Sequence, residues 1–317
     1  MKMTRRIEPL GALQRVAALG LACVLVACGG GTSQVESFTP SRLIAFGDEA
    51  SAFVPAGNGR KYAVNGLTNG VPDCRALPIW TQTVADVYGF GFAECPVGSG
   101  AQKAVSRAAV GASVVSIAEQ VTAQADLGSG DLVTVLVGVN DVKALYNESL
   151  LPGSRSRDQL LDDARARGVA LGNHLKSISD RGARIIVSTI PDLGLSPFGR
   201  APAADAGFLT SLSARFNDGL KVNLPGKSGS GGDGRKVALV FADELVQQAS
   251  GNPATYSLDN ATGSVCSGAV LPDCTTATLV ADANASRWLW ADDTWFAHGG
   301  HQQLGTLARN RALNNPF

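Results

Sequence analysis

The most constraining feature of the sequence is a series of short, almost uninterrupted apolar runs. They lie at residues 42–46 (RLIAF), 131–137 (DLVTVLV), 184–190 (RIIVSTI) and 236–241 (KVALVF). Glycine or proline comes after the first three runs, as expected where a strand ends. Runs of this length without polar alternation are typical of strands that are buried on both faces of a parallel sheet.

Segments with a helical spacing of apolar residues separate these runs. We expect helices at residues 78–88, 114–125, 159–181, 208–222 and 302–313. Strands that alternate with helices predict an α/β fold of three layers, α/β/α, with a flavodoxin-like parallel sheet in the middle. This single domain is expected to cover residues 40–317, with loops at residues 226–234 and 251–286.

The composition excludes some classes of protein. Hydrophobic residues make up 45% of the chain and charged residues 17%, which is not the composition of a disordered protein. The 27 Lys and Arg residues balance the 27 Asp and Glu residues, so the formal net charge is zero. A chain without a basic excess has little attraction for nucleic acid, and we therefore expect no nucleic-acid partner.

Residues 1–27 are typical of an export signal. Four Lys and Arg residues precede an apolar run at residues 16–27, which is shorter than the roughly 20 residues of a membrane-spanning helix. The run ends in LVAC at Cys28, and this ending resembles the lipobox of bacterial lipoproteins. An ordinary signal followed by a chance cysteine is the alternative.

The lipobox resemblance implies cleavage before Cys28 and a lipid on its thiol. Residues 28–39 are rich in Gly, Ser and Thr and would then form a flexible tether. The lipid bilayer is the implied partner, because such a lipid anchors a protein without a spanning helix. Lipoproteins without Asp after the cysteine usually reach the outer membrane, and Gly29 stands there. We expect a lipid-anchored protein of the bacterial cell envelope, facing the periplasm.

Four further cysteines come after Cys28, namely Cys74, Cys95, Cys266 and Cys274. An even number in an exported chain indicates two disulfides. Three pairings are open, and we favour Cys74–Cys95 and Cys266–Cys274 because short loops close at low entropic cost. A zinc site is the alternative, but the CxxC spacing is missing, and we expect neither a metal nor a cofactor.

Four segments at the predicted strand ends carry candidate chemistry. They are Gly47-Asp48, AAVGA around Gly111, GVND at residues 138–141, and residues 292–301 before the last helix. In this order they resemble the four blocks of the SGNH, or GDSL, family of esterases and lipases. The strongest match is DLVTVLVGVND at residues 131–141, and PDLG at residues 191–194 is also similar to a family segment. The resemblance covers residues 40–317.

In that family a serine attacks an ester carbonyl, a histidine takes its proton, and an aspartate orients the histidine. The resemblance implies that Asp292 stands at the position of the aspartate. It also implies that the backbone N–H of Gly111 and the side-chain amide of Asn140 form the oxyanion hole. An ester or acyl compound is the implied ligand.

Two positions depart from the family pattern. Glu49 stands where the serine belongs, and Trp295 stands where the histidine belongs when the last block is aligned on its Gly-His pair. A carboxylate repels a developing oxyanion, and loss of one triad member lowers turnover by about four orders of magnitude. We therefore expect a binding relative that is impaired in ester hydrolysis. A Glu49 carboxylate within hydrogen-bond reach of the Gly111 amide and Asn140 would indicate such a blocked oxyanion hole.

Two alternatives stay open. Ser51 lies two residues after Glu49 and His298 lies three residues after Trp295, so a shifted Ser51–His298 pair would make an active carboxylic-ester hydrolase. The second alternative is a structural envelope lipoprotein, with the fold acting as a spacer on its anchor. His301 is expected to cap or pack at the start of the last helix rather than to act in catalysis.

Overall fold

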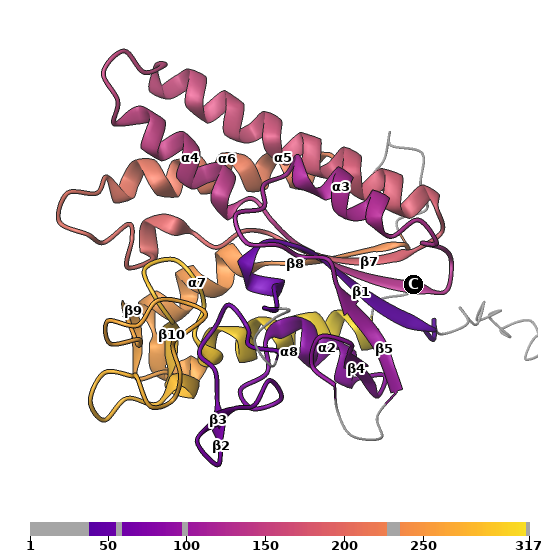
Figure 1. Ribbon diagram of the computed structural model, residues 1–317. Coiled ribbons are helices and arrows are strands. Elements are labelled where there is room, and N and C mark those ends of the chain that lie inside the picture. Colours follow the sequence, from indigo (N-terminus) through magenta and orange to yellow (C-terminus); the bar gives the residue numbers. More distant parts are fainter. Residues whose placement is uncertain (1–37, 55–58, 97–100, 227–234, 315–317) are drawn as a thin grey trace, which may run out of the picture. The chain divides into compact units, whose positions relative to one another are not determined.

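A six-stranded parallel sheet forms the centre of the computed structural model, which describes residues 38–54, 59–96, 101–226 and 235–314 (Figure 1). The strand order is β4-β5-β1-β6-β7-β8. The bounds are Arg42–Gly47 (β1), Phe90–Phe92 (β4), Ala101–Ser106 (β5), Asp131–Leu136 (β6), Arg184–Ser188 (β7) and Val237–Val240 (β8). The four apolar runs are β1, β6, β7 and β8, so their prediction is confirmed. β4 and β5 were not predicted.

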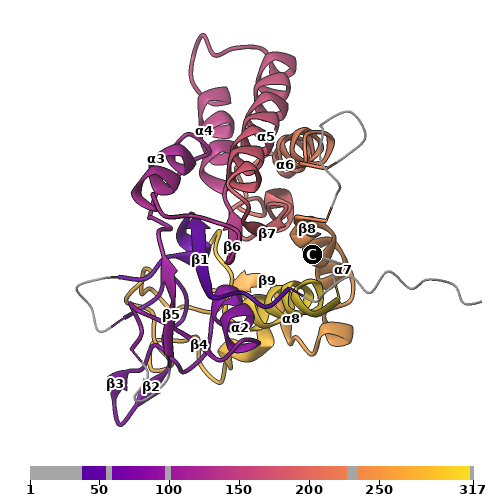
Figure 2. The same ribbon diagram turned by 90° about the vertical axis from the view of Figure 1, so that its right-hand side faces the viewer.

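Helices cover both faces of this sheet (Figures 1 and 2). One face carries Ser116–Ala123 (α3), Val139–Ser149 (α4), Arg157–Asp180 (α5) and Ala206–Val222 (α6). The other carries Trp80–Asp86 (α2) and His298–Asn314 (α8), with Ala242–Gly251 (α7) after β8. The three-layer α/β/α architecture is confirmed, as are all five predicted helices. α4 and α7 are additional.

The pairing of β1 with β6 brings the ends of both strands to one level. Arg42 lies opposite Asp131 at the start of the pair, and its Nε donates to Asp131 Oδ1 at 2.6 Å. Gly47 lies opposite Leu136 at the other end. The loops that leave these two strands therefore begin at the same edge of the sheet.

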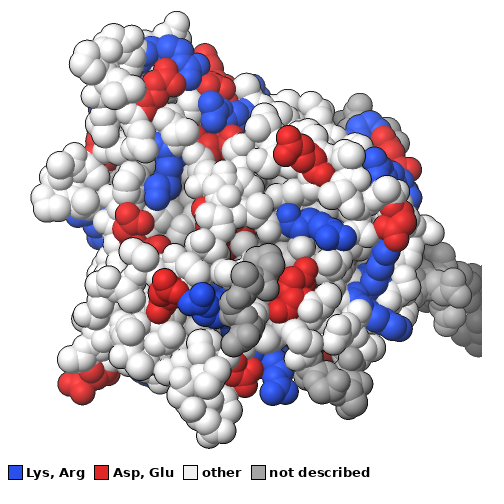
Figure 3. Space-filling view, viewed as in Figure 1, with Lys and Arg blue, Asp and Glu red and all other residues white. Residues whose placement is uncertain are grey.

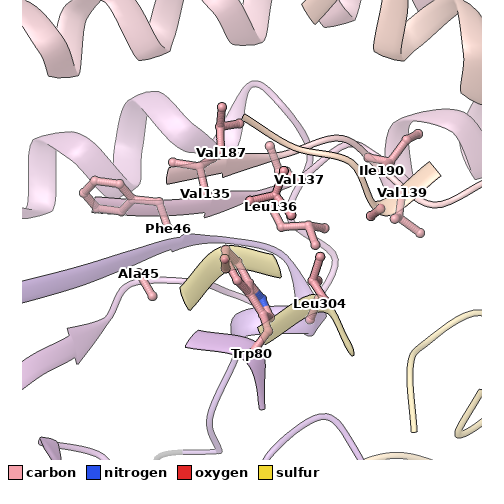
Figure 4. Packing of buried hydrophobic residues seen from close by; sticks show 14 of the residues in the cluster. Ala45, Phe46, Trp80, Val135, Leu136, Val137, Val139, Val187, Ile190 and Leu304 are labelled. Atoms are coloured by element: carbon pink, nitrogen blue, oxygen red, sulfur yellow. The ribbon is translucent and has the colours of Figure 1, made fainter. Parts of the chain in front are cut away.

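The core lies between this central sheet and the helices on its two faces (Figure 4). Phe46 of β1 and Leu136 of β6 have no exposed surface or almost none, as do Trp80 of α2 and Leu304 of α8. Burial of side chains of this size contributes about 1.5–3 kcal/mol each to folding. β1 and β6, which lead to the strand-end loops, thus pack into this core through large buried side chains.

Two disulfides join the cysteines in the favoured pairing, Cys74–Cys95 and Cys266–Cys274, and confirm it. The prediction of a mere loop over residues 251–286 was wrong, because this stretch contains a strand that pairs with a second strand after it. The bounds are Asn260–Ser264 (β9) and Trp288–Trp290 (β10). Shorter elements are the hairpin Leu67–Thr68 (β2) with Val71–Pro72 (β3), and the 3-10 helices Glu49–Ser51 (η1), Leu193–Leu195 (η2), Pro253–Tyr256 (η3) and Ala285–Arg287 (η4).

Two buried polar side chains hold the segments next to the two disulfides. Nδ2 of Asn65 donates to the backbone oxygen of Pro272 at 2.9 Å, and its Oδ1 accepts from the backbone N–H of Lys61 at 2.9 Å. Lys61 has no exposed surface, and its Nζ donates to the backbone oxygens of Cys74 at 2.9 Å, Ala76 at 2.7 Å and Leu77 at 3.1 Å. Burial lowers the pKa of Lys61 to about 7. These three carbonyls accept all three ammonium hydrogens and thereby fix the loop before α2.

The predicted signal segment, Cys28 and the tether up to residue 37 lie outside the described residues, as do residues 227–234 of the predicted loop. Within the part of the chain that is described, no helix has the length and apolarity needed to cross a bilayer. Acidic and basic side chains are interspersed on the face shown in Figure 3. Among the described residues, several acidic and basic side chains form ion pairs, such as Arg155 with Glu148 and Lys176 with Asp180.

Candidate functional site

The candidate site lies where three neighbouring strands end. β1 lies between β5 and β6 in the sheet, and the chain continues from one side of β1 to the other. Glu49 comes after β1, Gly111 comes after β5, and Asn140 lies in the first turn of α4, which comes after β6. Such a reversal of strand order is where open α/β sheets bind ligands, beyond the carboxyl ends of their strands.

Glycines shape the two turns that leave the sheet here. Gly47 has φ +137°, and a Cβ on it would lie 2.0 Å from the backbone oxygen of Leu136. Gly138 has φ +125°, and a Cβ on it would lie 2.2 Å from Cζ of Phe216. Only glycine fits both the backbone angle and the space at these positions. The turns that place Glu49 and Asn140 therefore depend on these two residues.

The Glu49 carboxylate occupies the space between the two candidate oxyanion donors. The backbone N–H of Gly111 donates to Oε1 at 2.8 Å, and Nδ2 of Asn140 donates to Oε2 at 2.8 Å. Asn140 Nδ2 also donates to the backbone oxygen of Ala112 at 3.0 Å. Glu49 is only 7% exposed and takes part in none of the ion pairs of the described residues. The contact expected from the sequence is present.

Asp48 precedes Glu49 in the chain and is fully buried. It caps η1, because its Oδ1 accepts a hydrogen bond from the backbone N–H of Ala50 at 3.2 Å, whereas its Oδ2 has no partner among the described residues. Burial raises the pKa of Asp48 well above its usual range, and the charges of Glu49 and Asp141 raise it further. The neutral form of Asp48 is the form that this environment favours.

Asp292 makes its hydrogen bonds within its own turn. Its Oδ1 accepts from the backbone N–H groups of Thr294 at 2.9 Å and Trp295 at 2.7 Å. Burial raises the pKa of Asp292, although these two N–H groups act in the opposite direction. Trp295 is 9% exposed and belongs to the apolar core. The side chain at the histidine position thus carries no basic nitrogen, and Asp292 holds the loop that bears it.

In the structure, Ser51 and His298 have different hydrogen-bond partners. Ser51 has no exposed surface, and its Oγ accepts a hydrogen bond from Nε1 of Trp80 at 3.1 Å. His298 instead has its Nδ1 3.2 Å from the backbone oxygen of Pro78. No hydrogen bond joins Ser51 to His298 among the described residues. The hydroxyl is held by a core tryptophan, and the imidazole is held by the chain segment before α2.

His301 packs inside the start of α8, in agreement with the sequence prediction. It is 1% exposed, and its ring lies edge-on to Phe296 with the centroids 6.0 Å apart. Its Nδ1 accepts a weak hydrogen bond from the backbone N–H of Trp80 at 3.5 Å. Burial lowers the pKa of His301 to about 3, which favours the neutral form of the imidazole.

Sequence reasoning missed Lys143, which lies one helical turn after Asn140 on α4. Its Nζ lies 4.9 Å from the ring centroid of Phe198 and 3.9 Å from Oδ1 of Asp293. The spacing of three residues on a helix could have indicated it, because such residues share one face. α4 therefore contacts both Glu49, through Asn140, and the loop that carries Trp295, through Lys143.

Two pockets lie at the edges of the sheet, away from this site. One of about 470 Å³ lies between β8, α7 and α8, and Tyr256 and Asn310 are in its wall. Another of about 440 Å³ adjoins β4, with Phe90 and Cys95 in its wall. Within the described residues, no group of three or more His, Cys, Asp or Glu side chains is arranged to hold a metal ion.

No family model matches the chain, and no curated protein matches it. Several solved structures are similar. A member of the lipolytic protein G-D-S-L family from Veillonella parvula is 11% identical with a TM-score of 0.41, and the match covers 86% of this chain and 96% of that one. An extracellular lipase from Streptomyces rimosus is 15% identical with a TM-score of 0.45, covering 87% and 99%.

An acetylxylan esterase from Geobacillus stearothermophilus is 14% identical with a TM-score of 0.43, and the match covers 88% of this chain and 96% of that one. These three structures are among those to which the chain is similar, and their sequence identities to it are all low. The three similar structures named here are thus a lipolytic protein of the G-D-S-L family, a lipase and an acetylxylan esterase.

Proposed function

We propose that the chain is a GDSL-type relative that does not hydrolyse esters by the serine mechanism and that binds an ester or acyl ligand at or near its closed site. The observation that carries this proposal is the Glu49 carboxylate between the Gly111 N–H and the Asn140 amide, at 2.8 Å from each donor. In a serine hydrolase these donors must be free to receive the oxyanion of the reacting carbonyl. Here a side chain of the protein itself satisfies them.

The groups around Glu49 do not replace the serine as nucleophile or the histidine as general base. Attack of the carboxylate on an ester would expel the alcohol and leave an anhydride on Glu49. Its release needs an activated water, and Trp295 at the histidine position has no basic nitrogen to accept the proton of that water. The Glu49 charge also opposes a second negative charge in the same place.

A ligand would reach this site past Gly111, which is exposed. Val110, the residue before Gly111, is 51% exposed, and Val115, four residues after Gly111, is 76% exposed. Exposed apolar side chains of this size favour contact with a hydrocarbon group over contact with water. They support an acyl group as the part of the ligand that lies nearest to the site.

The test is whether the purified protein turns over simple esters. We expect no hydrolysis of p-nitrophenyl acetate or butyrate above the buffer rate and no labelling by a fluorophosphonate, with a serine esterase assayed in parallel. The double variant Glu49→Ser with Trp295→His restores a hydroxyl and an imidazole and should become labelled. Hydrolysis and labelling of the unmodified protein that vanish in Ser51→Ala would overturn the proposal and favour the shifted pair.

We also propose that a lipid on Cys28 anchors the protein in the outer membrane of the bacterial envelope, where the protein faces the periplasm. The support is the LVAC ending of the apolar run at residues 16–27. Cells fed an alkyne fatty acid should incorporate it into the protein, and the Cys28→Ser variant should carry none. Equal incorporation in both proteins would contradict the anchor.

A further inference from the structure

The two donors around Glu49 reach different atoms of its carboxylate. Gly111 donates to Oε1 and Asn140 donates to Oε2, each at 2.8 Å. Donors that stabilise a tetrahedral intermediate must instead converge on a single oxygen. Two parallel hydrogen bonds to two oxygens are the geometry by which planar carboxylates are recognised. The arrangement therefore fits a carboxylate better than the oxyanion of a reacting ester.

Neither donor depends on Glu49 for its position. The second hydrogen of Asn140 Nδ2 goes to the backbone oxygen of Ala112 at 3.0 Å, which fixes the direction of the amide. Asn140 also lies in the first turn of α4, a helix of 11 residues whose N-terminus favours a negative charge. Gly111 is held by a turn in which the N–H of Ala112 donates to the oxygen of Ala109 at 3.2 Å.

We propose that Gly111 and Asn140 form a binding site for a small carboxylate, which the chain keeps occupied with its own Glu49. Shortening Glu49 leaves both donors in place without an acceptor, and a free carboxylate such as acetate or formate then takes the vacated position. This inference rests on the proposed function, because it takes Glu49 to be an occupant of the site rather than a reacting group.

In the unmodified protein Glu49 competes with any external carboxylate. A tethered group acts at an effective concentration of millimolar or more, so a free ion at millimolar concentration gains little against it. A natural ligand would have to combine its carboxylate with further contacts, and the exposed Val110 and Val115 offer apolar ones. The ligand class to which this reasoning leads is a carboxylic acid anion with a hydrocarbon part, rather than its ester.

The test is a titration of the Glu49→Ala variant with sodium acetate and sodium formate, balanced with sodium chloride at constant ionic strength. We expect saturable binding in calorimetry and a rise in Tm with ligand concentration, with an affinity at least tenfold above that of the unmodified protein. Methyl acetate, which carries no charge, should not bind.

Two matched variants separate the site from general effects. Glu49→Ala combined with Asn140→Leu removes one donor and should lose most of the acetate affinity. Glu119→Ala removes an exposed carboxylate of α3 and should leave the protein without acetate binding. Equal acetate affinity in the single and the double variant, or none in either while both are folded by circular dichroism, would overturn the inference.

A measurement on the unmodified protein tests the inference even if the Glu49 variants do not fold. Gly111 is exposed, and Glu49 is the only acceptor of its N–H among the described residues. Its amide hydrogen should therefore exchange slowly for a residue in an exposed turn. In Glu49→Gln, the NH2 group of the side chain cannot accept a hydrogen bond, so one of the two donors loses its acceptor and exchange of the Gly111 amide should accelerate. Fast exchange of this amide in the unmodified protein would contradict the occupied site. Ester hydrolysis by the unmodified protein would count against the proposed function alone.

Discussion

Nζ of Lys143 donates a hydrogen bond to Oγ1 of Thr294 at 2.8 Å, and this bond joins the helix that carries Asn140 to the loop that carries Trp295. Thr294 Oγ1 donates in turn to Oδ1 of Asp293 at 2.6 Å. The two sides of the candidate site are thus connected by a lysine that lies outside every block of the family resemblance.

The Lys143→Met variant should loosen this connection. It keeps most of the apolar stem of the side chain but removes the hydrogen bond and the cation above the Phe198 ring, and we expect a loss of about 1 kcal/mol in the free energy of unfolding. Urea unfolding measures the loss, and faster amide exchange of Trp295 locates it. Lys176→Met, which removes an exposed pair with Asp180, should cost only about 0.3–0.5 kcal/mol. Equal losses in the two variants would contradict a specific role for Lys143.

Gly138 should tolerate no side chain. Gly138→Ala combines a positive φ with a Cβ 2.2 Å from the Phe216 ring, and we expect it to lower the free energy of unfolding by about 3 kcal/mol or more. Gly70→Ala is the matched control, because its φ is +79° but nothing lies within 4 Å of the added Cβ. That control should lose about 1 kcal/mol from backbone strain alone. Thermal and urea unfolding of both variants give the comparison.

Much of the fold was predictable because strands that are buried on both faces consist mainly of apolar residues. β6 and β7 are buried along almost their whole length, and both appear as continuous apolar runs. β5 was missed because its first three residues are exposed and are small or polar. It therefore has neither an apolar run nor a clear alternation of apolar and polar residues. α4 was missed because it begins inside the segment that ends β6, and the GVND block was taken as the end of a strand alone.

The contacts of Glu49 were predictable for a topological reason. Residues that come after neighbouring parallel strands meet at one edge of a sheet, so Glu49 after β1 and Asn140 after β6 were expected to lie close together. Gly111 comes after β5, which was not predicted, and its expected place came from the family resemblance alone. The partners of Asp292 were not predictable in this way, because they come from its own turn and depend on local backbone angles. Lys143 was missed for the related reason that α4 itself was not expected.

Asn140→Ala should destabilise the site by leaving acceptors without donors. Both Glu49 Oε2 and the backbone oxygen of Ala112 lose a partner, and one of the lost bonds is to a charged group. We expect a loss of about 2 kcal/mol in the free energy of unfolding. Asn310→Ala, on the exposed side of α8, should change it by less than about 0.5 kcal/mol. A loss no larger than that of the control, measured by urea unfolding, would show that Asn140 does not hold Glu49.

Asp48 should make the protein less stable as the pH rises. Its pKa is raised in the folded chain, first by burial and then by the charges of Glu49 and Asp141, so the folded chain binds this proton more tightly than the unfolded chain. Its contribution to the free energy of unfolding is therefore fully present below a pH of about 4 and is lost as the pH rises through the raised pKa.

Asp48→Asn removes this dependence, because an amide keeps the oxygen that accepts from Ala50 and carries no charge. We expect the variant to be more stable than the unmodified protein at pH 8 and the difference to shrink toward pH 4, as measured by urea unfolding across that range. Burial also raises the pKa values of Asp141 and Asp292, but these residues are present in both proteins, so the difference reports Asp48. Asp86→Asn, at an exposed position of α2, should give a curve parallel to that of the unmodified protein. Parallel curves for Asp48→Asn as well would mean that Asp48 is ionised beside Glu49 throughout this range.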